Sequence, residues 1–338
     1  FLCCIHHHKN THNVTDIYTV HHHQHGLSII VVGASGDLAK KKTYPSLFDL
    51  FVANLLPKST IIWGYARTLQ THQQLRDQLR PYIISSQHNT NNTHLIDSFL
   101  SKCYYQSGKS YGDLQAWKEL ITIMDQDNDN AGELQNRMFY FAIPPTVFGE
   151  TSMAIHQTMM ESSSRGWSRL VIEKPFGSNL ETAKELNSVV ERVFPEDSVF
   201  RIDHYLGKQA VQNMLALRLG NRIFEPLLTR EHVAYVQITV AEDLGVEDRA
   251  GFYEHAGALR DMVQSHILQL LAIVAMEPPV SLEANSLRDE KLKVLRSLKV
   301  PQITGVPEIV VGQYGEGYVK GQAVPKYRNE KGVAANST

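Results

Sequence analysis

The sequence predicts an α/β fold that begins with a Rossmann-like, doubly wound parallel sheet and continues into a second domain of different pattern. Three observations lead to this prediction: the length, an alternation of apolar runs with helix-like segments, and a glycine turn after the first run. A chain of 338 residues is too long for one ordinary core, and 43% hydrophobic with 20% charged residues is typical of globular domains. We therefore expect two domains, residues 26-200 and 201-338.

Five apolar runs mark the strands expected in the first domain. Helix-like segments lie between them, for example Ser178 to Phe194, which has an N-cap candidate and apolar residues at helical spacing. Apolar strands that alternate with helices are typical of a parallel sheet covered on both faces. The five runs are LSIIVVG, TIIWGYAR, RMFYFAIP, RLVIEKPFG and SVFRIDHY.

The pattern changes after Glu231, where the second domain is already under way. The segment HVAYVQITVAED, residues 232–243, predicts a strand, and Glu254 to Met276 predicts a long, largely apolar helix. The chain then ends in a polar tail that contains glycine and asparagine. Strands of this domain would lack neighbours and leave unpaired edges, so we expect the domain to be incomplete.

Charge and cysteine content exclude several classes of partner. The 33 basic and 35 acidic residues give a formal net charge of -2, which calls for neither a nucleic acid nor an acidic membrane surface. No run approaches the roughly 20 apolar residues of a membrane span. The three cysteines, Cys3, Cys4 and Cys103, form no disulfide framework and indicate a reducing compartment, so we expect a cytoplasmic protein.

The first segment, residues 1-25, holds 8 of the 16 histidines and follows no helical or strand period. We interpret it as a disordered, His-rich extension. A Cys/His metal site is the alternative, but the spacing matches no zinc pattern, so we expect no metal.

The glycine turn lies in the stretch IIVVGASGDLAKKK. Gly33 ends the first expected strand and Gly36 opens the next segment, where backbone amides can approach a pyrophosphate at a helix N-terminus. Ser35 stands where the second glycine of the motif G-x-G-x-x-G would be, so a plain strand-to-helix turn is the alternative. The position after the first strand favours a phosphate cradle.

The second expected strand ends in GYART, where an enzyme that prefers NAD would usually carry an acidic residue for the ribose hydroxyls. Arg67 is there instead, and a guanidinium can bind a 2′-phosphate through two hydrogen bonds. This favours NADP over NAD. A solvated arginine after a strand is the alternative.

Six motifs give the sequence a family resemblance. GASGDLAKKK, GYAR, FAIPPTVF, EKPFG, RIDHYLGK and RDMVQSHILQ occur in the order and at about the spacing found in glucose 6-phosphate dehydrogenases, from about Leu27 to the end. The sequence thus resembles this family. The resemblance implies oxidation of glucose 6-phosphate to 6-phosphogluconolactone with hydride transfer to NADP, the first step of the oxidative pentose phosphate pathway, in a homodimer or tetramer.

The same resemblance assigns roles to the two domains. Residues 26-200 would be the dinucleotide-binding domain. Residues 201-338 would be a partial substrate and dimerisation domain, an incomplete α+β domain with a large antiparallel sheet. Two alternatives stay open: another two-domain NADP-dependent sugar oxidoreductase, and a coenzyme-binding fragment without catalysis.

The coenzyme-binding residues that we expect are Gly33, Ser35, Gly36, Asp37, Leu38, Arg67, Ala142, Pro144 and Lys174.

Oxidising a sugar hemiacetal requires a base near the anomeric hydroxyl, and imidazole is the natural base near neutral pH. His204 and His266 compete for this role. The resemblance implies that His266 is the general base and that Asp203 orients it and stabilises the imidazolium. Without the other motifs, Asp203 and His204 would be interpreted as a cap pair at a strand end.

The substrate-binding residues are likewise implied by the resemblance. His204 and Lys208 would hold the phosphate, and Tyr205 could add a hydroxyl donor. Lys174 would lie between coenzyme and sugar, while Glu242 and Asp261 would accept hydrogen bonds from sugar hydroxyls.

An ordinary α-helix would separate Asp261 and His266 by about 140° around its axis, because they are five residues apart. We therefore expect them to flank the substrate instead of sharing one stripe.

The sequence also departs from the family pattern. Phe148 stands where the family often has Tyr, and Ala250 where it more often has Gly. The family continues well beyond NEKGVAANST into the rest of a large antiparallel sheet. We therefore expect the 338-residue chain by itself to lack enzymatic competence.

Overall fold

The computed structural model describes residues 26–86, 93–129, 135–161, 166–242, 245–246, 249–299, 309–319, 321–334 and 336–337. Its internal contacts divide the chain into two units, Phe1–Ile202 and Asp203–Thr338. The His-rich extension expected for residues 1-25 lies outside the described residues.

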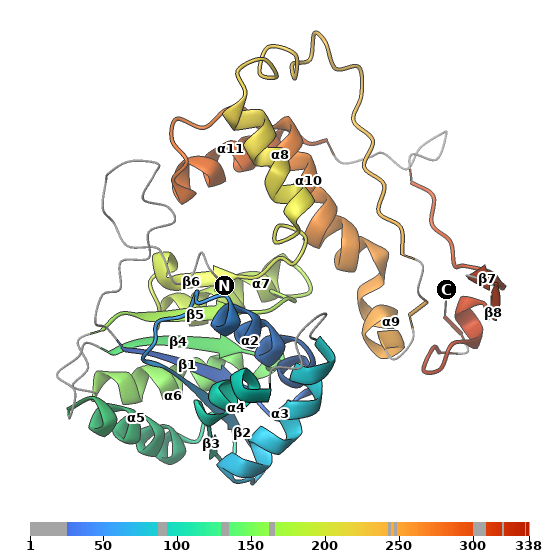
Figure 1. The fold of residues 1–338 in the computed structure, drawn as a ribbon. Coiled ribbons are helices and arrows are strands. Elements are labelled where there is room, and N and C mark those ends of the chain that lie inside the picture. Colours follow the sequence, from blue (N-terminus) through green and yellow to red (C-terminus); the bar gives the residue numbers. More distant parts are fainter. Residues whose placement is uncertain are drawn as a thin grey trace. The chain divides into compact units, whose positions relative to one another are not determined.

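Unit 1 is built on one parallel sheet whose strand order is β3-β2-β1-β4-β5-β6 (Figure 1). The chain moves outward from β1 in one direction through β2 and β3, and in the other through β4, β5 and β6. This reversal beside β1 is the topological switch point at which such sheets bind ligands. The prediction of a Rossmann-like, doubly wound sheet is confirmed. The strands are β1 (Gly26–Val32), β2 (Thr60–Ala66), β3 (Cys103–Ser107), β4 (Gln135–Phe141), β5 (Ser168–Ile172) and β6 (Val199–Arg201).

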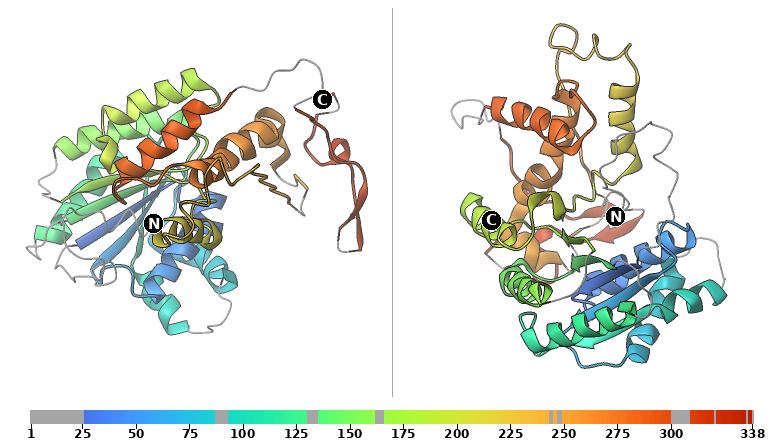
Figure 2. Two further views of the ribbon diagram at one scale, coloured as in Figure 1. Left: turned by 90° about the horizontal axis from the view of Figure 1, so that it is seen from above. Right: turned by 90° about the vertical axis from the view of Figure 1, so that its left-hand side faces the viewer.

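Both faces of this sheet are buried because β1 sends alternate side chains into two cores. All seven residues of β1 are buried. Ile29 belongs to a cluster with Phe48 and Leu75, whereas Ile30 belongs to another cluster with Leu120. Figure 2 shows helices on both sides of the sheet. Their bounds are η2 (Ala39–Thr43), α2 (Tyr44–Val52), α3 (His72–Ser86), α4 (Thr93–Ser101), α5 (Leu114–Asp129), η3 (Pro145–Val147), α6 (Phe148–Met160), α7 (Leu180–Glu191) and η4 (Glu196–Ser198).

Helix α7 confirms the helix expected between Ser178 and Phe194. Its N-cap is Asn179, whose side chain accepts a hydrogen bond from the backbone N–H of Thr182 at 2.9 Å. The Thr182 hydroxyl in turn accepts from the Asn179 N–H at 3.1 Å. This reciprocal pair satisfies two N–H groups that the first turn of a helix leaves without carbonyl partners.

Strand β3 was not among the five expected strands. It has five residues, of which only Cys103 and Tyr105 are buried, and it lies at the edge of the sheet. An edge strand that is short and half exposed produces no continuous apolar run, so the sequence pattern does not reveal it.

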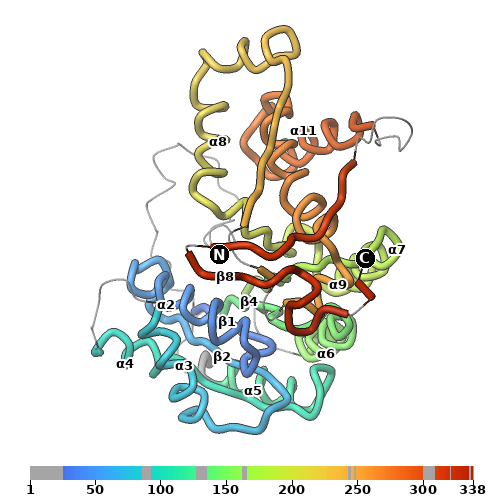
Figure 3. Tube along the Cα trace, turned by 90° about the vertical axis from the view of Figure 1, so that its right-hand side faces the viewer, coloured from blue at the N-terminus to red at the C-terminus, as the bar shows by residue number. Residues whose placement is uncertain are grey.

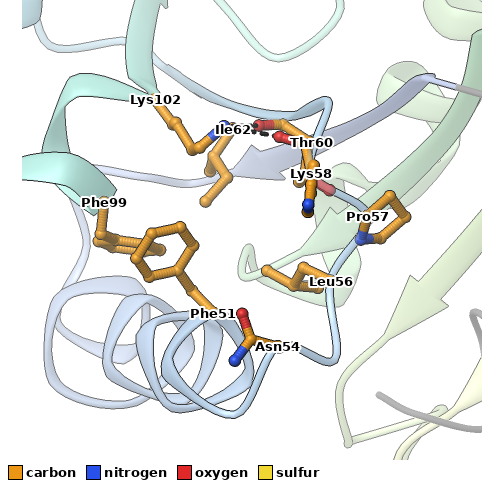
Figure 4. A pocket seen from close by; sticks show the side chains of 9 residues that line it. All are labelled: Phe51, Asn54, Leu56, Pro57, Lys58, Thr60, Ile62, Phe99 and Lys102. Carbon is orange, nitrogen blue, oxygen red and sulfur yellow. Dashed lines mark hydrogen bonds between the residues drawn. The ribbon is translucent and has the colours of Figure 1, made fainter. Parts of the chain in front are cut away.

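A small cavity opens at the amino end of β2 (Figure 4). Its volume is about 50 Å³, and its walls include Phe51, Phe99 and Ile62. The Lys102 ammonium at its rim donates to the backbone carbonyl of Lys58 at 2.8 Å. Because Thr60 pairs with Leu27 at the start of β1, the cavity lies at the opposite edge of the sheet from the glycine turn.

Unit 2 is mainly helical in its described residues. The Arg218 guanidinium, near the end of α8, donates to the carbonyls of Ile273 and Met276 at the end of α10, the second contact being 2.8 Å. α10 also packs against α11. The elements are α8 (Gln209–Gly220), α9 (Ala250–Ala258), η6 (Leu259–Ile267), α10 (Leu268–Ala275), α11 (Ala284–Ser297), the antiparallel pair β7 (Gly317–Val319) and β8 (Gln322–Val324), and η7 (Tyr327–Asn329).

The strand predicted for residues 232–243 is wrong for the part that the structure describes. Residues 232–242 form no strand, and the chain passes from α8 toward α9 without regular structure there (Figure 3). A β-strand requires a neighbouring strand for its N–H and C=O groups, and no described segment pairs with this one. The β propensity of VAYVQITV is therefore not realised.

The single helix predicted from Glu254 to Met276 is also corrected. Three helical segments, α9, η6 and α10, follow one another, and Gly257 interrupts them with φ 64° and ψ 172°. Glycine adopts this conformation readily because it has no Cβ. Among the described residues, no helix is long and apolar enough to cross a membrane.

Candidate functional site

The turn after β1 requires glycine at position 33. Gly33 has φ +91°, and its N–H donates to the carbonyl of Tyr65 at 2.7 Å. A Cβ at this position would lie 2.3 Å from the carbonyl oxygen of Ala142. The turn therefore depends on the absence of a side chain at residue 33.

Helical structure begins directly after this turn, at Asp37 and Leu38. The Gly36 N–H closes the turn onto the Gly33 carbonyl at 2.9 Å. The first N–H groups of a helix have no carbonyl partner in a preceding turn, and they carry partial positive charge. The Asp37 side chain faces along the helix, where a hydrogen bond from Lys41 at 2.9 Å lowers the pKa of Asp37. This turn at the start of a helix is where the sequence predicts a phosphate cradle.

The ends of β1, β2 and β4 bring several predicted coenzyme residues to one edge of the sheet. The Thr68 hydroxyl, just after β2, donates to the Ser35 hydroxyl at 3.2 Å. The Ala142 N–H, just after β4, donates to the Val32 carbonyl at 2.9 Å, and Pro144 precedes η3. These contacts assemble the edge at the switch point.

Arg67 follows β2 at this same edge, next to Thr68. Its side chain is exposed, and its guanidinium carbon lies 5.3 Å from the centre of the Tyr111 ring. An aromatic ring beside a guanidinium orients it without occupying its five N–H donors.

Lys174 follows β5, in unit 1, and its side chain is half-buried. The peptide bond from Lys174 to Pro175 is cis. The preceding Glu173 is buried and accepts a hydrogen bond from the Tyr140 hydroxyl. β5 is thus followed by a buried carboxylate and then by a half-buried lysine.

The catalytic residues predicted in unit 2 form a direct pair. The distance between His266 Nδ1 and Asp203 Oδ1 is 2.7 Å, although the two residues are 63 positions apart. His266 is 3% exposed, and the Tyr205 N–H donates to the same Asp203 oxygen at 2.8 Å. A carboxylate only accepts, so we assign the proton to Nδ1 of the neutral ring, which leaves Nε2 with a lone pair.

Tyr205 packs directly on the His266 ring. The two rings are stacked with their centres 4.2 Å apart and their planes 20° apart. The Lys208 ammonium lies 3.7 Å from the centre of the Tyr205 ring, and the Tyr205 hydroxyl donates to Glu242 at 3.3 Å. Burial raises the pKa of Tyr205, and the negative charge of Glu242 adds to this effect.

Asp261 and His266 lie on one face of η6, contrary to the expected separation of about 140°. The reason is that η6 is a π-helix, in which each N–H bonds to the carbonyl five residues before it, so residues five apart are about one turn apart. Asp261 and His266 are the two buried residues of this segment, with 5% and 3% exposure. The prediction assumed an ordinary α-helix and was wrong.

Arg249 is a residue of this region that the sequence interpretation did not single out. Its guanidinium lies 3.1 Å from the Asp261 carboxylate and over the ring of Phe252, with the guanidinium carbon 5.3 Å from its centre. Nothing in the stretch EDRAGF indicates that Arg249 binds Asp261. The two residues are twelve positions apart, and only the folded chain brings them together.

His204 and Lys208 are both exposed in the short segment that leads into α8. The Lys208 N–H donates to the Tyr205 carbonyl at 3.1 Å, and the Lys208 carbonyl accepts from Val211 and Gln212. The segment RIDHYLGK therefore forms a turn that places Asp203 toward the buried His266 and leaves the side chains of His204 and Lys208 at the surface.

The two departures from the family pattern are buried. Phe148 packs on Phe141 with ring centres 5.4 Å apart, and Ala250 is 1% exposed at the start of α9. Among the described residues, no group of three or more His, Cys, Asp or Glu side chains could hold a metal ion.

Comparisons with known proteins cover nearly the whole chain. Residues 30–213 match the family model described as glucose-6-phosphate dehydrogenase, NAD binding domain, and residues 215–338 match its C-terminal domain. The chain belongs to the glucose-6-phosphate dehydrogenase family. Together the two models span both units, so this assignment does not depend on the coenzyme domain alone.

Two members of the glucose-6-phosphate dehydrogenase family are 42% and 44% identical to the chain. Glucose-6-phosphate 1-dehydrogenase of Dictyostelium discoideum is 42% identical over 314 residues, which is 92% of this chain and 60% of that protein. Cytoplasmic glucose-6-phosphate 1-dehydrogenase 5 of Arabidopsis thaliana is 44% identical over 308 residues, 90% of this chain and 59% of that one. The chain thus spans about 60% of the length of these relatives.

Solved structures of the family show the same fold. A glucose-6-phosphate dehydrogenase in complex with its substrate glucose-6-phosphate is 35% identical, with a TM-score of 0.84 over 93% of this chain and 63% of that one. The glucose-6-phosphate 1-dehydrogenase of Mycobacterium avium is 32% identical, with a TM-score of 0.75 over 93% and 64% of the two chains.

Proposed function

We propose that this chain carries the coenzyme domain and catalytic pair of an enzyme that oxidises glucose 6-phosphate to 6-phosphogluconolactone and reduces NADP. The observation that carries the proposal is the contact of 2.7 Å between His266 and Asp203, in a family whose members are named for this reaction. Unit 1 is the proposed dinucleotide-binding domain and unit 2 the proposed substrate domain. The test is NADPH formation by the full-length protein, followed by absorbance, with glucose 6-phosphate and NADP.

His266 is the proposed general base. Its Nε2 accepts the proton of the anomeric hydroxyl while the C–H bond at the same carbon breaks and the carbonyl of the lactone forms. NADP supplies, when bound, the nicotinamide that takes up the hydride. The reaction thus releases one hydride and one proton, and the proton passes to His266.

Asp203 and Tyr205 hold the base in place. The carboxylate keeps the proton on Nδ1 and stabilises the imidazolium that forms when Nε2 accepts a second proton. The stacked Tyr205 ring restricts rotation of the imidazole, and the Tyr205 N–H anchors the carboxylate. Both groups fix the imidazole before the substrate binds, so the ring loses less conformational freedom when the reacting atoms align.

The remaining polar groups of unit 2 suit a phosphorylated polyol. His204 and Lys208 are exposed cations or donors beside Tyr205, and we propose that they bind the phosphate. Glu242 and Asp261 present carboxylates, and Arg249 keeps the Asp261 carboxylate oriented. Lys174 is the proposed ligand from unit 1.

The residues at the edge of the parallel sheet fit a dinucleotide phosphate. A Cβ at Gly33 would collide with the Ala142 carbonyl, so glycine lets the turn after β1 pack directly against the chain that follows β4. Ser35, Gly36, Asp37 and Leu38 follow it at the start of a helix, where N–H groups attract anions. We propose that Arg67 binds the 2′-phosphate, and that Ala142, Pro144 and Lys174 border the coenzyme.

Replacing Lys208 with Ala is expected to raise the KM for glucose 6-phosphate by about ten- to a hundredfold, because one charge-assisted contact to the phosphate is lost. Activity toward unphosphorylated glucose should change by less than about threefold, since that sugar has no phosphate to bind. Steady-state kinetics with both substrates check this. Equal losses for the two sugars would assign Lys208 to structure or catalysis instead.

Replacing Arg67 with Ala is expected to weaken NADP binding by about ten- to a hundredfold and NAD binding by much less, because only NADP has a 2′-phosphate. A hydrogen bond to a charged group contributes about 1.5 to 3 kcal/mol. Calorimetric titration with each coenzyme measures both affinities. Arg192→Ala, at the end of α7, is the control for the loss of an exposed arginine, and a parallel loss of NADP and NAD in R67A would contradict the assignment.

We also propose a cytoplasmic homo-oligomer. Two of the Arabidopsis relatives are named as cytoplasmic and another as chloroplastic, so both compartments occur in the family. Fractionation of cells and sedimentation of the purified protein test the two statements separately.

A further inference from the structure

Residues 67–71 connect β2 to α3, and we call them the β2–α3 loop. Arg67 is the first residue of this loop, and Thr68 joins it to the glycine turn through Ser35. A connecting loop is ordinarily more mobile than the elements that it joins. The accuracy with which Arg67 can meet a phosphate therefore depends on the contacts that hold this loop.

The side chain of Tyr105, on β3, holds the loop near its start. Its hydroxyl donates to the backbone carbonyl of Thr68 at 2.6 Å. Tyr105 is 3% exposed, and burial raises the pKa of Tyr105 to about 12, so the hydroxyl keeps the proton that it donates. This hydrogen bond fixes the peptide group directly after Thr68.

The backbone of Tyr105 holds the far end of the loop. The Gly108 N–H, which faces β2, donates to the Ala66 carbonyl at 3.1 Å. Successive N–H groups of a strand point to opposite sides, so the Tyr105 N–H, three residues earlier, faces away from β2. There it donates at 3.0 Å to Nδ1 of His72, the first residue of α3. One residue of β3 thus contacts the chain near both ends of the loop.

Arg67 lies between two anchored residues. The carbonyl of Ala66 before it accepts the backbone hydrogen bond from the end of β3, and Thr68 after it is bound by both Tyr105 and Ser35. None of these contacts uses the guanidinium of Arg67. The backbone at Arg67 is therefore held while its N–H donors are left for a ligand.

We propose that Tyr105 is a positioning residue for coenzyme specificity: through Thr68 and His72 it fixes the β2–α3 loop, so that the Arg67 guanidinium meets the 2′-phosphate of NADP. Tyr105 acts through the loop and does not touch the coenzyme. A loop that is ordered before binding loses less conformational freedom when the phosphate enters. This inference rests on the proposed function, in which Arg67 binds the 2′-phosphate.

The first experiment titrates NADP and NAD into the full-length protein by calorimetry and compares Tyr105→Phe with Tyr104→Phe. Y105F removes only the hydroxyl that binds Thr68, so NADP affinity is expected to fall about three- to tenfold and NAD affinity by less than about twofold. Y104F is the matched control, because Tyr104 is the neighbouring tyrosine of β3 and its side chain points to the opposite face of the sheet. It should bind both coenzymes like the wild type. Wild-type NADP affinity in Y105F, or equal losses of NADP and NAD, overturns the proposal.

A double-mutant cycle separates positioning from a general structural role. If Tyr105 acts through Arg67, the double variant R67A/Y105F should bind NADP within about twofold of R67A alone. A structural role that is independent of Arg67 predicts instead that the two losses multiply, and this result contradicts the inference.

If Y105F does not fold, His72→Ala decides, because His72 is exposed and accepts the other hydrogen bond of Tyr105. H72A should lose affinity for NADP about three- to tenfold and for NAD by less than about twofold. Unchanged affinity for both coenzymes in H72A would refute the role of Tyr105.

Hydrogen exchange of the coenzyme-free protein distinguishes a failure of this inference from a failure of the proposed function. Amide exchange in residues 67–71 should be about three- to tenfold faster in Y105F than in the wild type, with unchanged exchange in β1. Equal exchange rates in the loop overturn the positioning role, whether or not the protein binds NADP. If the wild type neither binds NADP nor forms NADPH, the proposed function fails, and faster exchange in Y105F still supports the hold of Tyr105 on the loop.

Discussion

In the full-length protein, the variant His266→Asn is expected to lower kcat for the oxidation of glucose 6-phosphate by about 10² to 10⁴, the usual contribution of a positioned general base. Affinity for substrate and coenzyme should stay within about threefold of the wild type, because the base stabilises the transition state and not the bound ground state. The side-chain amide of Asn can still donate to Asp203 Oδ1, so the fold of unit 2 should persist. Steady-state kinetics and coenzyme titration of the purified variant measure the three quantities.

The matched control for H266N is His255→Asn, on α9. His255 is an exposed histidine in the same unit, eleven positions earlier, and has no place in the proposed reaction. Its replacement should leave kcat unchanged. If H266N retained turnover within a factor of two of the wild type, His266 would have no role as the base, and His204 would be the next histidine to test.

Replacing Gly33 with Ala is expected to destabilise unit 1 and to weaken NADP binding by more than about tenfold. The left-handed backbone at φ +91° costs a residue with a Cβ about 1 to 2 kcal/mol. The collision with the Ala142 carbonyl, 2.3 Å from the new carbon, adds to this cost, because backbone atoms of β4 and its loop must move. Thermal unfolding and calorimetric titration with NADP measure the two effects.

The control for G33A is Gly149→Ala, on α6. A Cβ there would meet the Val189 side chain at 3.5 Å, an ordinary contact, and alanine favours helices over glycine by about 1 kcal/mol. G149A should therefore be as stable as the wild type or more so. An unfolding temperature and an NADP affinity in G33A equal to those of the wild type would show that neither the turn nor the cradle depends on glycine.

The parallel sheet of unit 1 was predictable because its strands are buried on both faces. Residues such as Ile29 and Ile30 are both apolar, so the strand appears in the sequence as a continuous run between a polar segment and a glycine turn. The edge strand β3 was not predicted because three of its five residues are only partly buried, so it contains no continuous apolar run. The strand predicted at 232–243 was wrong for a different reason. Its composition suits a strand, but no described segment pairs with it.

The order of residues alone specifies which chemical groups are available: the glycine at the turn, an arginine after β2, and an aspartate, histidine, tyrosine and lysine within a few positions of one another. The same order also identified the family. Which of these groups meet depends on the folded chain. Folding brings His266 to Asp203 across 63 residues and places Arg249 on Asp261.

The π-helix shows why the two kinds of information differ. A sequence pattern is interpreted with the spacing of an ordinary helix or strand. In an ordinary α-helix, Asp261 and His266 would point in different directions. The hydrogen bonding of η6 changes the number of residues per turn and aligns them. Because helix geometry and long-range contacts depend on packing against the rest of the chain, they are properties of the folded molecule and leave no local signal in the order of its residues.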